Sequence, residues 1–284
     1  MKIAYYRNQS NEMVPCLVTS KGLINIESLD LYNKNDLTGL SLIQQNDLEK
    51  KILGNDSVKF KFLNGNGLSF GPCLPTNGKI ICIGLNYRKH AEESGMPIPE
   101  TPVVFTKYSN TLTDFGSDIP LGKEGIEFDY EVELGVIIGK NCKNVSKAEA
   151  LNYVMGYCVA NDLSCRDLQF KTSQWLLGKS LDKFLPLGKY FVSANEINNP
   201  QNLQLTCTVN GEVRQLSNTS DMIFSVAEII AYLSKHMTLE TGDLILTGTP
   251  EGVIMGRSDK KWLRPGDVVK VEIEKIGSTQ NMMV

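Results

Sequence analysis

The sequence predicts a mainly β protein with some α-helix (α+β), built as a large sandwich or roll that follows a small N-terminal α+β domain. From residue 79 onward, β-rich runs bounded by turn residues clearly outnumber helical segments. These runs do not alternate with helices, which disfavours a doubly wound parallel sheet. A stretch rich in Gly, Pro and Asn, residues 64–78, marks the boundary. We therefore expect domains at residues 1–70 and 71–284.

The N-terminal domain is predicted from short β-rich runs and one helical stretch. The runs "KIAYYR", "MVPCLVTS" and "GLINI" are each typical of a short strand. A polar helical segment is expected around Leu48 to Leu53. Together they predict a small α+β unit.

The second domain contains stronger strand signals and three helix starts. The predicted strands are "KIICIG", "PVVFTK", "FDYEVELGVIIG", "YVMGYCVAND", "LQLTCTV", "DLILTG" and "DVVKVEIEK". Asn210-Gly211 in "VNGEV" is the strongest short hairpin signal in the chain. Capping boxes predict three helices, at Ser146 with Glu149, Ser164 with Asp167, and Ser225 with Glu228.

Composition excludes several classes of partner. The 284 residues are 42% hydrophobic and contain no run of about 18 apolar residues, so we expect neither a membrane span nor a signal peptide. Seven scattered cysteines without a C-x-x-C pair indicate reduced thiols and a cytoplasmic protein. A net charge of −3 with interspersed signs predicts no nucleic-acid or membrane partner.

Four acids occupy every second position of "IEFDYEVELG": Glu127, Asp129, Glu131 and Glu133. Alternate side chains of an extended chain share a face, so all four carboxylates are expected on one side. Such a column is either a solvated face, the commoner case, or part of a cation site. With Asp162, which follows another β-rich run, three carboxylates would suit Mg²⁺ or Mn²⁺. The spacing does not select two of the four acids.

Histidine, lysine and threonine supply further candidate groups. His90 has Glu93 at i+3 and is a candidate general base, although an exposed helix histidine is the equal alternative. His236 ends a predicted helix, where a cation is favoured electrostatically, so it is expected to be structural. Lys179 in "WLLGKSL" and Thr249 in "ILTGTPEGV" lie at Gly-bounded positions that could hold a carboxylate.

Taken together, these segments resemble one known family. "CIGLNYRKHAEE", "PVVFTK", "DYEVELGVIIGK", "GYCVANDLSCRDLQ", "GKSLDKFLPLG" and "TLETGDLILTGTPEGV" are similar, in order and spacing, to the fumarylacetoacetate hydrolase family over roughly residues 79–284. The resemblance implies a mixed β-roll, a homodimer and a divalent metal. The larger members carry a fourth acidic ligand upstream of the histidine, whereas "CIGLNY" has none. The chain therefore resembles the smaller acylpyruvase-like and diketo-deoxy-sugar-acid hydrolase members.

The resemblance also implies a role for each candidate residue. The metal ligands are expected to be Glu131, Glu133 and Asp162, with Glu127 and Asp129 as neighbours. The catalytic set would be His90, Glu93 and Lys179, with His90 and Glu93 on a short lid helix, and the substrate would contact Gln169 and Thr249.

The activity implied first is hydrolysis of a C–C bond in a 2,4-dioxo acid. The substrate would be a small anionic 2-oxo acid that reacts through an enolate stabilised by Mg²⁺ or Mn²⁺, with water activated by the His-Glu pair. The alternatives in the same scaffold are an oxaloacetate decarboxylase and a keto-enol isomerase, hydratase or lyase. A cation-stabilised binding or structural protein is the non-enzymatic alternative.

Overall fold

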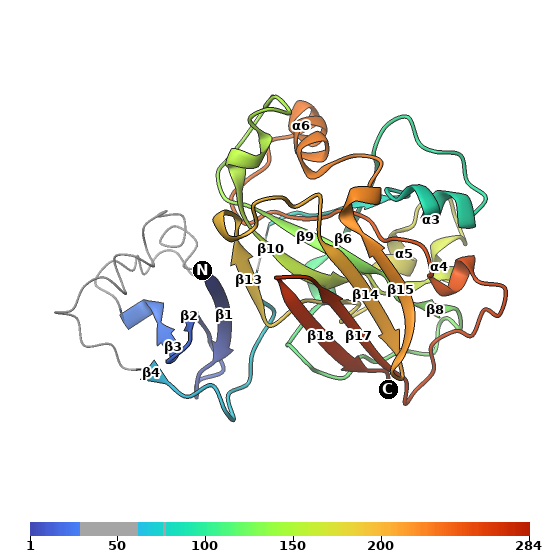
Figure 1. The fold of residues 1–284 in the computed structure, drawn as a ribbon. Coiled ribbons are helices and arrows are strands. Elements are labelled where there is room, and N and C mark those ends of the chain that lie inside the picture. Colours follow the sequence, from blue (N-terminus) through green and yellow to red (C-terminus); the bar gives the residue numbers. More distant parts are fainter. Residues whose placement is uncertain (29–61, 76–77) are drawn as a thin grey trace.

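The computed structural model describes residues 1–28, 62–75 and 78–284 (Figure 1). The helix predicted around Leu48 to Leu53 lies outside the described residues. The strands predicted at the N-terminus and after residue 79 are confirmed, and the protein is mainly β with a few short helices. Within the described residues, no helix is long and apolar enough to cross a membrane.

The largest sheet in the described residues is a mixed sheet of ten strands. Its neighbouring strands are antiparallel except β16 and β5, which are parallel. All residues of β9 and β10 are buried, which explains their nearly continuous apolar sequences. In spatial order the strands are β4 (Phe62–Leu63), β3 (Gly22–Asn25), β2 (Met13–Thr19), β1 (Lys2–Arg7), β13 (Tyr190–Ser193), β10 (Val154–Asn161), β9 (Val132–Ile138), β16 (Leu244–Leu246), β5 (Ile80–Gly84) and β6 (Val103–Lys107).

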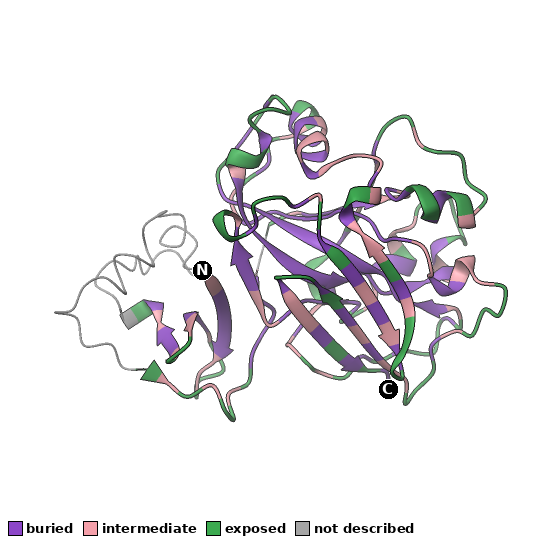
Figure 2. Cartoon of the chain, in the orientation of Figure 1, coloured by how far each residue is buried: buried purple, intermediate pink, exposed green. Residues whose placement is uncertain are grey.

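A four-stranded antiparallel sheet packs against β9 and β10 and forms the second layer (Figure 1). Its order is β15 (Glu212–Asn218), β14 (Gln204–Val209), β17 (Val268–Ile273) and β18 (Gly277–Met282). Val269, Val271 and Ile273 of β17 point into the core between the layers, while their neighbours are more exposed (Figure 2). Two short pairs complete the strands: β8 (Phe128–Asp129) with β11 (Ser164–Cys165), and β7 (Leu112–Thr113) with β12 (Leu185–Pro186).

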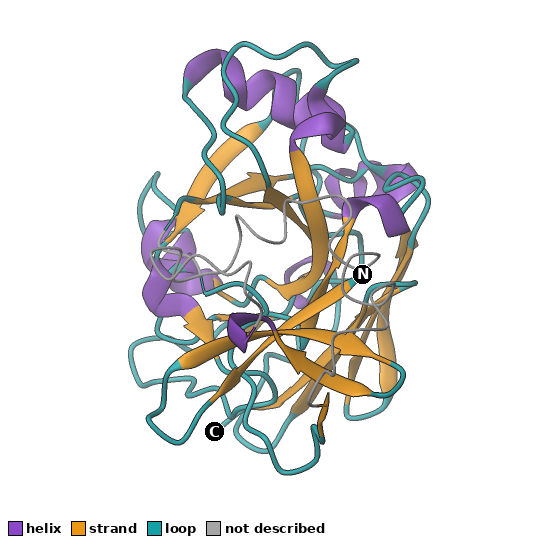
Figure 3. Cartoon of the chain, turned by 90° about the vertical axis from the view of Figure 1, so that its left-hand side faces the viewer, coloured by secondary structure: helices purple, strands orange, loops and turns teal. Residues whose placement is uncertain are grey.

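The helices are few and lie around the strands (Figure 3). The longest in the described residues is α6 (Val226–His236), which packs its apolar face onto the core through Ile229, Ile230 and Leu233. The others are single turns or little more: α3 (Arg88–Glu93), α4 (Arg166–Gln169) and α5 (Leu176–Lys179). The 3₁₀ helices are η1 (Ile26–Ser28), η2 (Ser109–Thr111), η3 (Ala150–Tyr153), η4 (Ala194–Glu196), η5 (Thr219–Asp221) and η6 (Ile254–Gly256).

Of the three predicted capping boxes one is confirmed, and the helix predicted after Ser164 is present as α4 but without its capping box. Ser225 and Glu228 form a complete capping box at the start of α6. After Ser146 the chain forms the 3₁₀ helix η3 and then enters strand β10 at Val154, so the α-helix predicted there is absent. Ser164 does not cap α4, since its hydroxyl donates to the carbonyl of Asp162.

The β14–β15 hairpin confirms the turn predicted at Asn210-Gly211. Val209 pairs with Glu212, and both turn residues have positive φ, 53° for Asn210 and 82° for Gly211. A two-residue turn of this kind matches the twist of the two strands.

The N-terminal strands continue the large sheet. β1 pairs with β13 through Ile3 opposite Phe191, and Tyr5 and Leu17 share one apolar cluster with Phe191 and Leu244. The division into residues 1–70 and 71–284 therefore stays a prediction about folding units.

Candidate active site

Three buried carboxylates converge where β9 and β10 meet. Glu133 lies on β9, Glu131 directly precedes that strand, and Asp162 directly follows β10. The strands pair with Ala160 opposite Glu133, and the Asp162 N–H donates to the carbonyl of Glu131 at 2.9 Å. Carboxylate oxygens of the three acids consequently lie within 4.8 Å of one another. The predicted convergence of these three residues is confirmed.

Three cations surround the carboxylates. Lys179 Nζ lies 2.7 Å from Glu131 Oε2 and 2.9 Å from Asp162 Oδ2. Lys107 Nζ lies 2.6 Å from Asp162 Oδ1, and Arg166 Nη2 lies 2.6 Å from Glu131 Oε1. Glu131 and Asp162 therefore each contact two cations, so their orientation is fixed before any ligand arrives.

The charges of this cluster shift the pKa values of its members. Burial alone would raise the pKa of Glu131, but the Lys179 and Arg166 charges outweigh burial and hold that pKa at about 2. For Lys179, burial lowers the pKa, and the charges of Asp162 and Glu131 more than compensate and raise it. Both groups are thus ionised at neutral pH.

Glu133 differs from the other two acids. Among the described residues, its carboxylate has one hydrogen-bond donor, the N–H of Gly248 at 2.7 Å, and no ion-pair partner. Burial, followed by the charges of Asp162 and Glu131, raises the pKa of Glu133 well above its usual range. A buried carboxylate beside two others, with free oxygen lone pairs, fits a site for a hard divalent cation. The all-oxygen donor set suits Mg²⁺ or Mn²⁺.

Asp129 corrects the expectation of one acidic face. The strand breaks between β8 and β9, so the four acids do not form a single column. Asp129 is fully buried and accepts hydrogen bonds from Arg166 Nε at 2.9 Å and from the N–H groups of Ile254 and Met255. Glu127 is half-buried, and its carbonyl accepts the N–H of Arg166. Asp129 therefore holds Arg166 and the chain around η6 in place.

The His90–Glu93 pair lies on α3. His90 Nδ1 and Glu93 Oε1 are 2.9 Å apart, and the Gly252 N–H donates to both carboxylate oxygens of Glu93 at 3.0 and 2.9 Å. His90 is 5% exposed, so the alternative of an exposed helix histidine is wrong. The bond at Nδ1 leaves Nε2 as the nitrogen able to accept or donate a proton.

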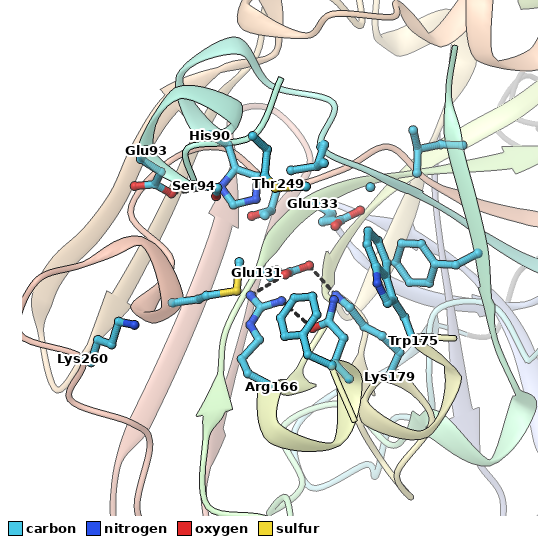
Figure 4. A pocket seen from close by; sticks show the side chains of 18 residues that line it. His90, Glu93, Ser94, Glu131, Glu133, Arg166, Trp175, Lys179, Thr249 and Lys260 are labelled. Atoms are coloured by element: carbon cyan, nitrogen blue, oxygen red, sulfur yellow. Dashed lines mark hydrogen bonds and ion pairs between the residues drawn. The ribbon is translucent and has the colours of Figure 1, made fainter. Parts of the chain in front are cut away.

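One cavity of about 330 Å³ joins these groups (Figure 4). Glu131, Glu133 and Lys179 line its floor, and His90 faces it from α3. Asp162 lies behind this surface, fully buried. The remaining lining residues are Ile83, Gly84, Leu85, Glu93, Ser94, Met96, Phe105, Arg166, Gln169, Phe170, Trp175, Thr249, Met255 and Lys260.

Gln169 and Thr249, the predicted substrate contacts, both line the cavity. Gln169 Oε1 accepts from Arg166 Nη1 at 2.8 Å, which leaves its amide N–H groups as donors. The Thr249 hydroxyl donates to the carbonyl of Val132 at 3.1 Å and accepts from Gln215 at 2.9 Å. Their roles in substrate binding stay predictions.

Sequence reasoning gave no role to Lys107, Arg166 or the aromatic residues of the cavity. Phe105 and Trp175 stack edge to face with ring centroids 5.3 Å apart and form one wall with Phe170. Lys107 ends the predicted strand "PVVFTK", and a lysine at the end of an apolar strand was a usable signal. No local pattern singles out Arg166.

Comparison with known proteins identifies the family. A sequence model described as fumarylacetoacetate (FAA) hydrolase C-terminal matches residues 79–284. The chain belongs to the fumarylacetoacetate hydrolase family. A relative from Dictyostelium discoideum, fumarylacetoacetate hydrolase domain-containing protein 2 homolog, is 42% identical over 91% of this chain and 88% of its own. The mitochondrial oxaloacetate tautomerase fahd2 of Xenopus laevis is 44% identical over 72% of this chain and 65% of its own.

Solved structures of the family share the fold of the whole chain. Fumarylacetoacetate hydrolase from Exiguobacterium antarcticum superposes with a TM-score of 0.83 at 29% identity, covering 100% of this chain and 99% of that one. The likeness to this structure therefore extends beyond residues 79–284, whereas a family protein from Yersinia pestis covers 74% of this chain with a TM-score of 0.66 at 33% identity. One relative is named as a mitochondrial protein, so the cytoplasmic location predicted for this chain stays an expectation.

Proposed function

We propose that the protein is a divalent-metal-dependent enzyme that interconverts the keto and enol forms of a small 2-oxo acid. The observation that carries this proposal is the placement of His90, with its Glu93 partner, over the same cavity whose floor is made by Glu131 and Glu133. A base that faces a cation site can move a proton on a substrate held there.

The metal site would be formed by Glu131, Glu133 and Asp162. When bound there, Mg²⁺ or Mn²⁺ supplies a Lewis acid that polarises the 2-oxo group and offsets the negative charge of the enol form. Lys179 and Arg166 fix Glu131 from the side away from Glu133, so the ligand oxygens are oriented in advance.

The chain's own residues would then bind the substrate and move the proton. His90 Nε2 would take a proton from carbon 3 of the keto form, and transfer of a proton to the oxygen on carbon 2 would complete the enol; the reverse reaction returns a proton from His90 to carbon 3. Glu93 fixes the tautomer of His90 by its bond at Nδ1. The amide N–H groups of Gln169 and the turn at Thr249, which both line the cavity, would bind the substrate carboxylate.

Oxaloacetate is the first substrate to test. Two relatives, from Xenopus laevis and Rattus norvegicus, are named oxaloacetate tautomerases and are each 44% identical to this chain. Tautomerisation also demands less of the site than hydrolysis, because it needs one base and no bound water. The assay follows the disappearance of enol-oxaloacetate by its ultraviolet absorbance, with Mg²⁺ and with EDTA.

Hydrolysis of a 2,4-dioxo acid, which the sequence favoured first, is the second candidate. The aromatic wall of Phe105, Trp175 and Phe170 beside the cavity supports it, because an apolar acyl group could pack there. His90 would take a proton from a water that attacks carbon 4, and cleavage of the bond between carbons 3 and 4 would release a carboxylate and pyruvate. Acetylpyruvate with enzymatic detection of pyruvate tests this reaction.

Replacement of His90 by Ala tests the proposed base in either reaction. We expect kcat to fall by about 10²- to 10⁴-fold, because that is the usual contribution of a positioned general base. The matched control is His236→Ala, since His236 ends α6 and does not line the cavity. Undiminished turnover by the His90 variant would contradict the assignment.

A further inference from the structure

One cation that lines the cavity has no role in the proposed chemistry. Lys260 follows η6 on the connection to β17, and it lines the cavity beside Met255 (Figure 4). The neighbouring charges of this loop are engaged with one another: Arg257 Nε lies 2.9 Å from Asp259 Oδ1, and Arg214 Nη1 lies 3.8 Å from Asp259 Oδ2. In the described part of the chain, no carboxylate lies within 4.0 Å of Lys260 Nζ.

The other lysine and arginine side chains that line the cavity already form ion pairs. Arg166 is paired with Asp129 and Glu131, and Lys179 is paired with Glu131 and Asp162. Among the lysines and arginines that line the cavity, Lys260 is therefore the one without an ion pair to a carboxylate of the described residues. An unpaired cation at a cavity rim attracts an anionic group of the ligand.

Lys260 lies at the side of the cavity, apart from Glu131 and Glu133 at its floor (Figure 4). In the view of Figure 4, Lys260 and Trp175 lie on opposite sides of Glu131. A 2-oxo acid bound with its reacting end at the floor could direct its far end either toward the apolar wall or toward Lys260. The two directions select different substrates, because one wall is aromatic and the other is charged.

We propose that Lys260 binds the distal carboxylate of the substrate, so that the preferred substrates are 2-oxo dicarboxylic acids. This inference rests on the proposed function, which places the 2-oxo acid end at the floor of the cavity. Lys260 contributes specificity and not chemistry, since it is exposed at the rim of the cavity.

The size of the effect follows from the exposure of Lys260. An ion pair at a solvated rim is weaker than a buried one, so loss of the lysine should weaken dicarboxylate binding by about 3- to 10-fold. The effect should also decrease as salt is added, because exposed charges are screened. Binding of monocarboxylates should not change.

The test compares two ligands of equal length that differ at the far end. 2-Oxoglutarate carries a distal carboxylate, and 2-oxopentanoate carries a methyl group in its place. Binding of each to the full chain with Mg²⁺ is measured by isothermal titration calorimetry for the wild type, for Lys260→Met and for the control Lys261→Met. Lys261 is the adjacent exposed lysine, and it does not line the cavity.

We expect the wild type and the Lys261 variant to prefer 2-oxoglutarate and the Lys260 variant to lose that preference. A charge reversal, Lys260→Glu, should favour 2-oxopentanoate. Equal ligand preference in the wild type and in Lys260→Met would overturn the role of Lys260 while leaving the proposed function intact. If the wild type bound neither ligand and turned over no 2-oxo acid, the proposed function itself would fail.

Discussion

At the residue scale, the site is defined by an imbalance among its carboxylates. Glu131 and Asp162 are each held by two protein cations, whereas Glu133 has a single backbone donor among the described residues. Removing a buried charge from water costs free energy unless a partner replaces the solvent. Glu133 is therefore the residue at which a bound cation would change the energy of the protein most.

Replacement of Glu133 by Gln should separate metal binding from folding. We expect Mn²⁺ affinity, measured by calorimetry, to fall on the order of 100-fold or more, since even indirect contacts to metal ligands are worth 10- to 100-fold. In EDTA the variant should be at least as stable as the wild type, because Gln removes a carboxylate that faces two others. Excess Mn²⁺ should raise the melting temperature of the wild type and not of the variant, because a ligand stabilises only the state that binds it.

The control for this experiment is Glu127→Gln. Glu127 belongs to the same acidic segment, but it is half-buried and not part of the converging cluster. Its variant should keep the affinity for Mn²⁺ and the thermal shift. Loss of Mn²⁺ binding in the Glu127 variant, or its retention in the Glu133 variant, would contradict the proposed ligand set.

The sequence indicated the candidate acids and one of their counterions, Lys179, but not Lys107 or Arg166. The alternate spacing put four acids on one expected face, and only the family resemblance selected Glu131 and Glu133 among them. Lys107 and Arg166 contact the acids across sequence separations of 55 and 35 residues, and of the two only Lys107 carried a local signal, its place at the end of an apolar strand. The burial of Asp129 was equally hidden, because it depends on a break in the strand and on contacts from residues near 254.

At the element scale, strands could be predicted better than helices. Apolar and β-branched runs specify β9, β10 and β17, whose side chains are buried between layers. The motif of a capping box has only two key positions, so it also occurs where the serine does not cap a helix. Ser164 is an example: its hydroxyl donates to the carbonyl of Asp162 and accepts no N–H of α4. Only at Ser225 does an amphipathic segment follow that packs onto the core.

The capping box of α6 makes a pH-dependent contribution to stability. Hydrogen bonds from Lys147 and from the Ser225 hydroxyl and N–H hold the pKa of Glu228 at about 2. Because this pKa is below the value of about 4.3 in an unfolded chain, ionised Glu228 stabilises the folded protein. The contribution is complete above about pH 5 and is lost as the pH falls through about 4 toward 2.

Replacement of Glu228 by Gln should reveal that dependence. We expect a loss of about 0.5–1 kcal/mol in the free energy of unfolding at pH 7, and a smaller difference from the wild type at pH 3. Urea unfolding at a series of pH values measures it. Ser225→Ala removes the other half of the box and should cost about 1 kcal/mol at pH 7. A difference for the Gln variant that is the same at pH 3 and pH 7 would argue against the ionic origin.

At the scale of the whole molecule, the sheet joins parts of the chain that the sequence separates. The Gly- and Pro-rich segment at residues 64–78 suggested a domain boundary, yet β1 pairs directly with β13. Local composition reports where the chain turns, but pairing between distant strands depends on the complete fold. The homodimer implied by the family resemblance stays a prediction for the same reason, since it depends on surfaces of the folded chain.

Deletion of residues 1–70 tests whether the two parts fold separately. We expect the remaining chain, residues 71–284, to unfold at much lower urea concentration or to aggregate. β1 and β2 bury Ile3, Tyr5 and Leu17 at 0% exposure against the same cluster as Phe191, and loss of β1 would leave β13 as an open edge. At about 1.5–3 kcal/mol for each buried side chain, these residues alone approach the 5–15 kcal/mol that stabilises an ordinary domain.

A single substitution serves as the graded control for the deletion. Ile3→Ala should lower the free energy of unfolding by about 2–5 kcal/mol and leave a cooperative transition, because it creates a cavity without opening the sheet. If residues 71–284 alone unfolded cooperatively at the midpoint of the full chain, the boundary near residue 70 would separate two independent domains. The β1–β13 pairing would then be a docking contact between them, and its loss would leave the carboxylate floor at β9 and β10 intact.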